Sequence, residues 1–243
     1  MNNKNQYIIP FSILGVAFIA GVILFTAAWR ANYKANQTIT VTGSSKMEIV
    51  SDLGVLRGTL SVRSYTAESA YRELNRQKPV LLAYLKSKGF TEDQIEFFTI
   101  NNYPVYEIGP NGYQTGKIEA YVYSQRIGVT SEDVNRIKEV SLDIPSLIEK
   151  GLSFDVEMPE YHYTKLAELK VEIQAAAAKD AMERALKIAE ATGRQLGPMR
   201  TARMGVLQIT PRLSNMISDY GINDLSSIEK EITAVVSASF EIE

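Results

Sequence analysis

The sequence predicts an α+β fold, with antiparallel sheets packed on long helices and one transmembrane helix in front of them. Two observations carry most of this prediction. An uncharged run of 23 residues, Tyr7 to Trp29, opens the chain. A stretch without Pro or Gly, Lys165 to Thr192, repeats apolar residues every three or four positions, as an amphipathic helix does. Between and after these stretches, several segments alternate apolar and polar residues, which is typical of half-buried strands.

The first run, Tyr7 to Trp29, is long enough to cross the hydrocarbon layer of a bilayer as a helix, with an aromatic residue at each end. A cleaved signal peptide and a buried core helix are the alternatives, but the apolar core of a signal peptide is usually only about 7–15 residues. Residues 1–6 then form a short tail and 30–37 a tether. Positive charges on the two sides of this run are nearly balanced and do not decide its orientation. The large C-terminal part is expected outside the cytoplasm because the tail before the run is so short.

The first half of the folded part is expected to have the order ββαββ. Thr66 is placed to cap its helix, and Pro79 is expected to kink or divide that helix. Residues 43–46 are expected to form a turn, because the spacing of a phosphate-binding loop is absent there. The expected elements are strands at 39–42 and 53–64, a helix at 67–88, and a long hairpin of 95–108 and 117–129 around a turn at 109–112.

The second half is expected to have the order αβαββ, so the domain from 38 to 243 divides into halves at about 38–130 and 131–243. The expected elements are a helix after 130–133 that Pro145 breaks, strands at 152–158, 207–210 and 232–242, a polar loop at 212–227, and the long helix. Thr164 is placed to cap the long helix and Gly193 to end it. Its small central residues predict that a sheet approaches its backbone closely. Its expected apolar face is Leu166, Leu169, Ile173, Ala177, Ala181, Ile188 and Thr192.

Composition excludes several classes of function. The net charge is −2, and no long basic block is present, so nucleic acid is not an expected partner. The absence of Cys excludes disulfides, thiol catalysis and Cys-ligated metal sites.

Chemically active residues do not form a recognisable site. His162, the single histidine, has no nucleophile motif nearby and is expected to have a structural or surface role. The segment 219–224 lacks the spacing of a calcium loop. The arginines Arg200, Arg203 and Arg212 could hold an anion, but such charges beside strands are more often solvated or paired. The sequence therefore predicts no catalytic residue, no cofactor and no metal.

Candidate contact residues lie in two places. The hairpin is rich in tyrosine, which indicates either stiffening cross-strand pairs or a surface for another subunit or a ligand. The loop 212–227, with nearby arginines, is the other candidate site. The candidate contact residues are Tyr103, Tyr106, Tyr113, Tyr121 and Tyr123 in the hairpin, and Arg203, Asp219 and Tyr220 in or near the loop.

Four segments in order, within residues 39–62, 161–197, 202–211 and 220–243, resemble the SIMPL-domain family, the YggE-like proteins of bacterial envelopes. The resemblance implies an α+β domain outside the cytoplasm, homo-oligomers that include ring- or channel-like ones, and links to oxidative-stress tolerance and to envelope antigens. It carries over no catalytic residue. With the apolar run, it implies a single-pass protein of the bacterial inner membrane with a periplasmic domain.

The leading hypothesis is therefore a non-enzymatic, membrane-anchored envelope protein that self-associates, with the bilayer and further copies of itself as partners. The alternatives are a module that binds a ligand or partner through the loop 212–227 and, less favoured, a hydrolase.

Overall fold

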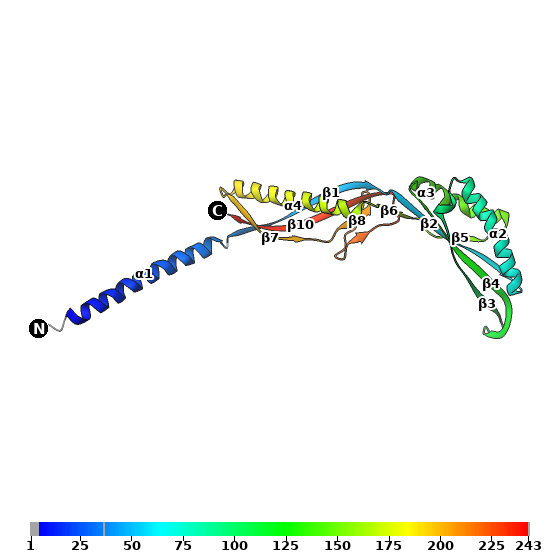
Figure 1. Cartoon of the computed structure of the whole chain (residues 1–243), viewed down its shortest axis with the longest axis horizontal. Helices are drawn as coiled ribbons and strands as arrows, with labels where there is room; N and C mark the ends of the chain where they lie inside the picture. Colours follow the sequence, from blue (N-terminus) through cyan, green and yellow to red (C-terminus); the bar gives the residue numbers. More distant parts are fainter. Residues whose placement is uncertain (1–4, 36, 243) are drawn as a thin grey trace. The chain divides into compact units, whose positions relative to one another are not determined.

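A computed structural model describes the backbone of residues 5–35 and 37–242 and the side chains of 12–29 and 37–242 (Figure 1). The chain divides into two compact units. Unit 1 comprises Met1–Lys46, Lys170–Leu207 and Thr233–Glu243, and unit 2 comprises Met47–Leu169 and Gln208–Ile232. The expected halves at 38–130 and 131–243 differ from this division, because the first strand, the long helix and the last strand each contribute residues to both units.

The N-terminal helix α1 (Asn5–Ala35) contains the expected apolar run. It continues to Ala35, so the backbone of residues 30–35, expected to form part of a tether, is helical. Residues 1–4 of the expected tail, residue 36 of the tether and the side chains of Tyr7, Arg30 and Lys34 lie outside the described part.

Unit 1 is built from α4 (Leu166–Ala191) and strands β1 (Thr38–Val50), β7 (Leu196–Met204) and β10 (Glu229–Ile242). Both β1 and β7 pair with β10. Every second side chain of β10 is buried, and Ala238 and Phe240 pack with Ala181 and Ala185 of α4. A helix therefore covers one face of the sheet, as the alternating pattern of the last strand predicts.

The buried face of α4 differs in part from the expected one. It steps by four residues throughout, through Leu169, Ile173, Ala177, Ala181, Ala185 and Ala189. Because four residues exceed one helical turn of 3.6, this buried row winds slowly around the helix. Near the C-terminus of α4 it therefore no longer coincides with the expected apolar face. Ile188 is therefore 45% exposed and Thr192 is also exposed, contrary to the expectation for both residues.

The expected close approach to α4 is confirmed at Gly43. A Cβ atom on this residue would lie 2.3 Å from the carbonyl oxygen of Ala177 and 2.3 Å from the nitrogen of Ala181. The Ser44 N–H donates to Asp180 Oδ2 over 2.8 Å. The expected turn at 43–46 is wrong, because these residues lie inside β1.

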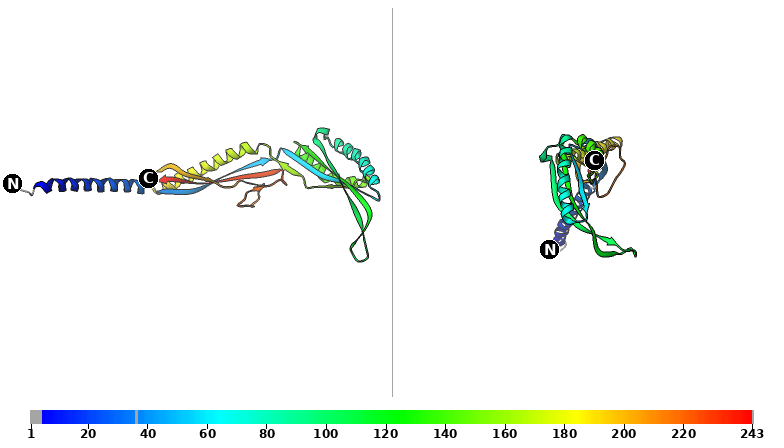
Figure 2. Two further views of the ribbon diagram at one scale, coloured as in Figure 1. Left: turned by 60° about the horizontal axis from the view of Figure 1, so that its bottom comes forward. Right: turned by 90° about the vertical axis from the view of Figure 1, so that its right-hand side faces the viewer.

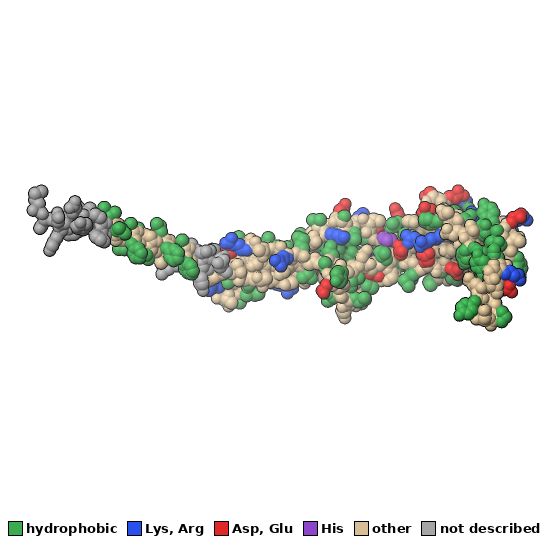
Figure 3. Space-filling view, turned by 90° about the horizontal axis from the view of Figure 1, so that it is seen from below, with side chains coloured by type: hydrophobic (Ala, Val, Ile, Leu, Met, Phe, Trp, Pro, Cys, Tyr) green, Lys and Arg blue, Asp and Glu red, His purple; other side chains and the backbone are tan. Residues whose placement is uncertain are grey.

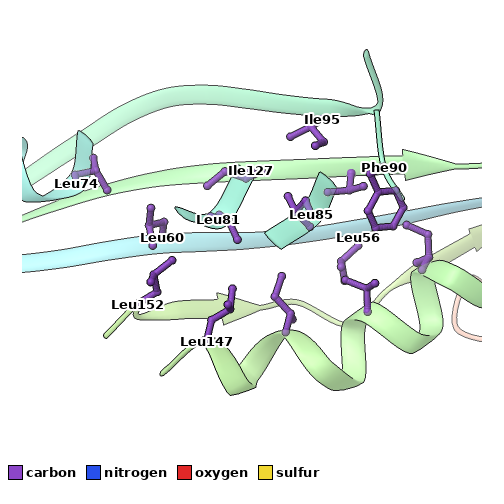
Figure 4. Close-up of a cluster of buried hydrophobic side chains, with 14 of the residues drawn as sticks. Leu56, Leu60, Leu74, Leu81, Leu85, Phe90, Ile95, Ile127, Leu147 and Leu152 are labelled. Carbon is purple, nitrogen blue, oxygen red and sulfur yellow. The ribbon is translucent and has the colours of Figure 1, made fainter. Parts of the chain in front are cut away.

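Unit 2 contains a sheet in the order β3-β4-β2, with two short strands on the far side of β2. Helices α2 (Ala67–Ser87), α3 (Val134–Asp143) and η2 (Ile144–Lys150) supply apolar side chains to the core that lies against this sheet (Figure 4). The strands are β2 (Leu53–Ser64), β3 (Ile95–Ile108), β4 (Gln114–Ser131), β5 (Phe154–Val156) and β6 (Glu160–His162).

The folded part begins with β1, β2, α2, a short 3-10 helix η1 (Glu92–Gln94), β3 and β4, so η1 interrupts the expected ββαββ order, and the second half also differs from its expected order. The second half contains β6, β7 and β9 (Ile222–Asn223) in addition to the expected strands β5, β8 (Gln208–Pro211) and β10. The strands β6 and β9 are too short to show a period, and β7 has almost no buried side chains to create one. The helix α2 remains one helix through Pro79.

Thr164 has a different role from the expected cap of α4. Its N–H and its hydroxyl both donate to the carboxylate of Asp52, each over 2.7 Å. The helix begins two residues later, at Leu166. The side chain therefore fixes the segment after β6 to the start of β2.

Candidate functional site

The hairpin of β3 and β4 extends past the end of β2. The last residue pair between β2 and β4 is Ser64 with Tyr121, whereas β3 and β4 stay paired as far as Ile108 with Gln114. Residues 105–120 are thus a two-stranded ribbon that lacks a third strand, here called the arm (Figure 2). The turn at its tip is closed by a hydrogen bond from the Gly109 N–H to the Tyr113 carbonyl.

The arm exposes large apolar side chains. Ile108 is 69%, Tyr113 75% and Ile118 40% exposed to solvent. A two-stranded ribbon is marginally stable in water unless a face of it packs on something. The arm therefore has the composition and the geometry of a contact surface.

The five candidate tyrosines of the hairpin do not share one surface. Tyr103 and Tyr113 are exposed, whereas Tyr106 and Tyr121 are half-buried. Tyr123 packs against the core of unit 2, and its ring lies 5.9 Å from that of Tyr71, edge to face. Tyr103 is paired with Val122 and therefore lies on the opposite face from Tyr123. Sequence reasoning missed Ile108 and Ile118, because isolated isoleucines in a strand pattern suggest core positions.

The loop 212–227, which is part of unit 2, is a second exposed apolar surface. Its large side chains, Leu213, Met216, Ile217 and Tyr220, are 85%, 64%, 84% and 98% exposed. Leu213 also has a φ of 63°, a conformation that side chains other than glycine rarely adopt. Sequence reasoning treated this loop as polar and selected only Tyr220 among the four.

Hydrogen bonds hold the middle and the C-terminal end of this loop. The Gln208 amide donates to the Ser218 carbonyl over 2.7 Å, and the Asp224 carboxylate accepts from the backbone N–H groups of Ser226 and Ser227. Lys230, which is buried, donates to the carbonyls of Tyr161 and Asp224. Burial lowers the pKa of Lys230, although the Asp224 carboxylate acts in the opposite direction.

The arginines are distributed over both units. Arg200 pairs with Glu241 in unit 1, and Arg212 pairs with both Glu48 and Glu229 in unit 2. Arg203 is exposed on β7, and Asp219 lies in the loop of the other unit. Two of the three arginines are thus already neutralised by carboxylates of their own unit.

His162 lies at the end of β6, with its Nε2 3.3 Å from Glu160 Oε2. Glu160 also binds Arg57 at 2.7 Å, and the hydrogen bond from that guanidinium lowers the pKa of Glu160. His162 lines a cavity of about 60 Å³ together with Lys230 and Tyr161. In the part of the chain that the structure describes, no three His, Asp or Glu side chains are grouped as a metal site.

A larger, open groove of about 660 Å³ lies in unit 1 between β1 and the C-terminal half of α4. Val41, Leu186 and Ile188 line it, together with charged residues of α4. Two of those charged residues, Asp180 and Arg184, form an ion pair of 2.8 Å.

The helix α1 has the length and composition of a membrane span or of a signal sequence. Within it, Ser12–Trp29 has a mean hydropathy of 2.2, and its apolar side chains are exposed (Figure 3). The ring centroids of Phe25 and Trp29 lie 5.9 Å apart near the end of this segment, with the ring planes tilted by 34°.

Comparison with known proteins gives a family without a known activity. No curated protein matches the chain. The model of one family, SIMPL, described as a protein of unknown function (DUF541), matches residues 39–240, which is nearly the whole folded part. The chain therefore belongs to the SIMPL family.

Proposed function

We propose that this protein is a non-enzymatic, membrane-anchored protein of the cell envelope that self-associates through its arm. The observation that carries this proposal is the unsupported ribbon at 105–120 with Ile108, Tyr113 and Ile118 exposed on it. The anchor is α1, a single pass through the bacterial inner membrane with the folded units outside the cytoplasm. A link to stress tolerance is part of the proposal and rests on the family resemblance alone.

The free energies of burial and of association explain why anchoring and self-association belong together. Burying the three exposed side chains of the arm would contribute at most roughly 4–9 kcal/mol, at about 1.5–3 kcal/mol for each. Association costs about 4–15 kcal/mol in lost freedom. The arm alone would thus give weak association in solution. Confinement to a membrane raises the effective concentration and shifts this balance towards assembly.

A non-enzymatic role is supported by the surroundings of His162. The cavity beside it, about 60 Å³, is far smaller than the roughly 300–1,000 Å³ of typical ligand pockets. The His162 Nε2 also lies 3.3 Å from a carboxylate oxygen of Glu160. A His162→Ala variant that lost a measurable activity would contradict this part of the proposal.

The test compares two triple variants of the full-length protein in detergent or nanodiscs. Ile108→Ser, Tyr113→Ser and Ile118→Ser together should reduce large species to monomers while the circular dichroism spectrum stays unchanged. The control replaces Tyr65, Leu142 and Ile148, which are 84%, 76% and 64% exposed in the same unit, by serine. Equal mass distributions for both variants would refute a role of the arm.

A second candidate function is the binding of a ligand or partner by the loop 212–227, favoured by its four exposed apolar side chains. Photo-crosslinking from Ile217 in cells distinguishes the two. An adduct with twice the mass of the chain would assign the loop to self-association, and an adduct with a different molecule would favour the binding module. The absence of any adduct would count against this candidate.

A further inference from the structure

We infer that the turn between α4 and β7 docks on anionic lipid headgroups through Arg194. This inference rests on the proposed role of α1 as a membrane span. It concerns unit 1 alone, to which α1, the turn and the sheet ends beside it all belong.

Several chain segments meet at Gln37, immediately after α1. The Arg194 guanidinium donates to the Gln37 side-chain oxygen over 2.9 Å. The Ile242 N–H donates to the Gln37 carbonyl over 3.1 Å, and Ile242 is paired with Leu196 at the start of β7. The turn at 192–195 is therefore tied to the residue that follows the membrane helix almost directly.

The length of chain limits how far this end can lie from the bilayer. Six helical residues from Trp29 to Ala35 span about 9 Å, and two more residues to Gln37 span at most about 7 Å. If Trp29 lies at the interface, Gln37 is thus within about 16 Å of it in any orientation of α1. The Debye length is about 8 Å at physiological salt, so the surface potential is largely screened at the full distance of about 16 Å. Docking therefore requires that Arg194 lie within about one Debye length of the headgroups, which this length of chain permits.

The turn is shaped to present Arg194 outwards. Gly193 has a φ of 70°, its N–H donates to the Glu190 carbonyl, and the Arg194 N–H donates to the Ala189 carbonyl over 2.8 Å. These bonds satisfy carbonyls at the C-terminus of α4 in a Schellman motif. All four residues at 192–195 are exposed, so the turn is accessible.

Charge at this end favours an anionic partner. In the range 37–242, no carboxylate forms an ion pair with Arg194. Two other cations near this end are neutralised, because Lys187 pairs with Glu190 and Arg200 pairs with Glu241. The sequence adds Arg30 and Lys34 before this end and Glu243 after it. By formal charge, Arg194, Arg30 and Lys34 outnumber Glu243, which leaves an excess of positive charge at this end of the sequence. Each cation near an anionic membrane strengthens binding about fivefold.

The experiment uses the full chain in nanodiscs. The chain has no Cys, so Gln195→Cys gives a single site for an environment-sensitive fluorophore. Headgroup-linked nitroxide lipid should quench it at least about twofold more with phosphatidylglycerol present than in phosphatidylcholine alone. Raising the salt to about 1 M, where the Debye length is about 3 Å, should remove the difference.

The matched variants are Arg194→Gln and Arg203→Gln. Both remove one exposed guanidinium from unit 1, but Arg203 lies seven residues, about 23 Å, along β7 from Leu196. Arg194→Gln should abolish most of the dependence on phosphatidylglycerol, and Arg203→Gln should preserve it. Equal quenching in both lipids, a difference that persists at high salt, or equal effects of the two variants would overturn the proposal.

Trp29, the single tryptophan, distinguishes a failure of the anchor from a failure of the docking turn. Quenching of Trp29 by brominated acyl chains shows that the anchor is inserted. If the fluorophore at residue 195 is insensitive to phosphatidylglycerol in that sample, docking is refuted and the anchor is not. An unquenched Trp29 would refute the anchor, and the docking inference would be refuted with it.

Discussion

Gly43 allows β1 to run directly against the backbone of α4. A side chain here would meet two backbone atoms at 2.3 Å, and backbone atoms inside a helix cannot move aside. Gly43→Ala should therefore lower the free energy of unfolding by about 1–3 kcal/mol, the usual cost of overpacking. Urea unfolding followed by circular dichroism measures this change.

The neighbouring Ser44→Ala is the matched control for Gly43→Ala. It keeps the backbone N–H that binds Asp180, and its side chain is exposed. Its effect should be within about 0.5 kcal/mol of zero. Equal unfolding midpoints for the two variants would show that the sheet and helix can separate at little cost.

Asp52 gives the protein a dependence on acid pH. Burial raises the pKa of this carboxyl, but the hydrogen bonds from the Thr164 hydroxyl and N–H outweigh burial and hold the pKa below its usual value. The stability gained is present above the unfolded pKa of about 3.9 and is lost as the pH falls through the lower folded value. Thr164→Val should therefore destabilise the protein at pH 7 more than at pH 3.

Chemical unfolding at both pH values measures the difference between wild type and Thr164→Val. Thr201→Val, at an exposed position of β7, is the control and should give the same small effect at both pH values. A wild-type advantage over Thr164→Val that is undiminished at pH 3 would argue that the Asp52 carboxylate is not its source.

At the scale of elements, α2 contains Pro79 without being divided. A proline in a helix interior removes one hydrogen bond and costs about 3 kcal/mol. Four leucine and alanine positions of α2, namely Ala70, Leu74, Leu81 and Leu85, are completely buried, and this packing holds the helix together. The tertiary core therefore overrides the local tendency of proline to divide a helix.

Replacing Pro79 by Ala should raise the free energy of unfolding by about 1–3 kcal/mol. The neighbouring Val80→Ala, at a position that is 42% exposed, should change it by only about 0.5 kcal/mol. Differential scanning calorimetry of both variants tests this prediction. A destabilised Pro79→Ala variant would indicate that the proline is needed for packing rather than merely tolerated.

Elements with a strong period or clear end signals could be predicted from the sequence. The strand β2, the cap at Thr66, the turn at 109–112 and the long helix were all expected near their observed places. The strands β6, β7 and β9 could not be predicted, because they form through pairing with other strands and their own residues show no strand pattern. The exposed isoleucines of the arm could not be predicted either, because exposure depends on where β2 ends.

At the scale of the whole molecule, the division into units depends on chain segments far apart in the sequence. The first strand, the long helix and the last strand extend through both units, so no linker marks a boundary in the sequence. The family and the α+β class could be predicted, because they follow from local segments in order. Membrane anchoring and self-association are proposals about this larger scale, and the apolar surface of α1 and the arm motivates both.

The most direct test of the central claim is the mass of the full-length protein extracted from membranes in mild detergent. The chain has a mass of 27.1 kDa. We predict that it stays in the membrane fraction after an alkaline wash and that native mass spectrometry finds defined multiples of this mass. A protein released by the wash, or one that remains a 27.1 kDa monomer at high concentration, would contradict the account.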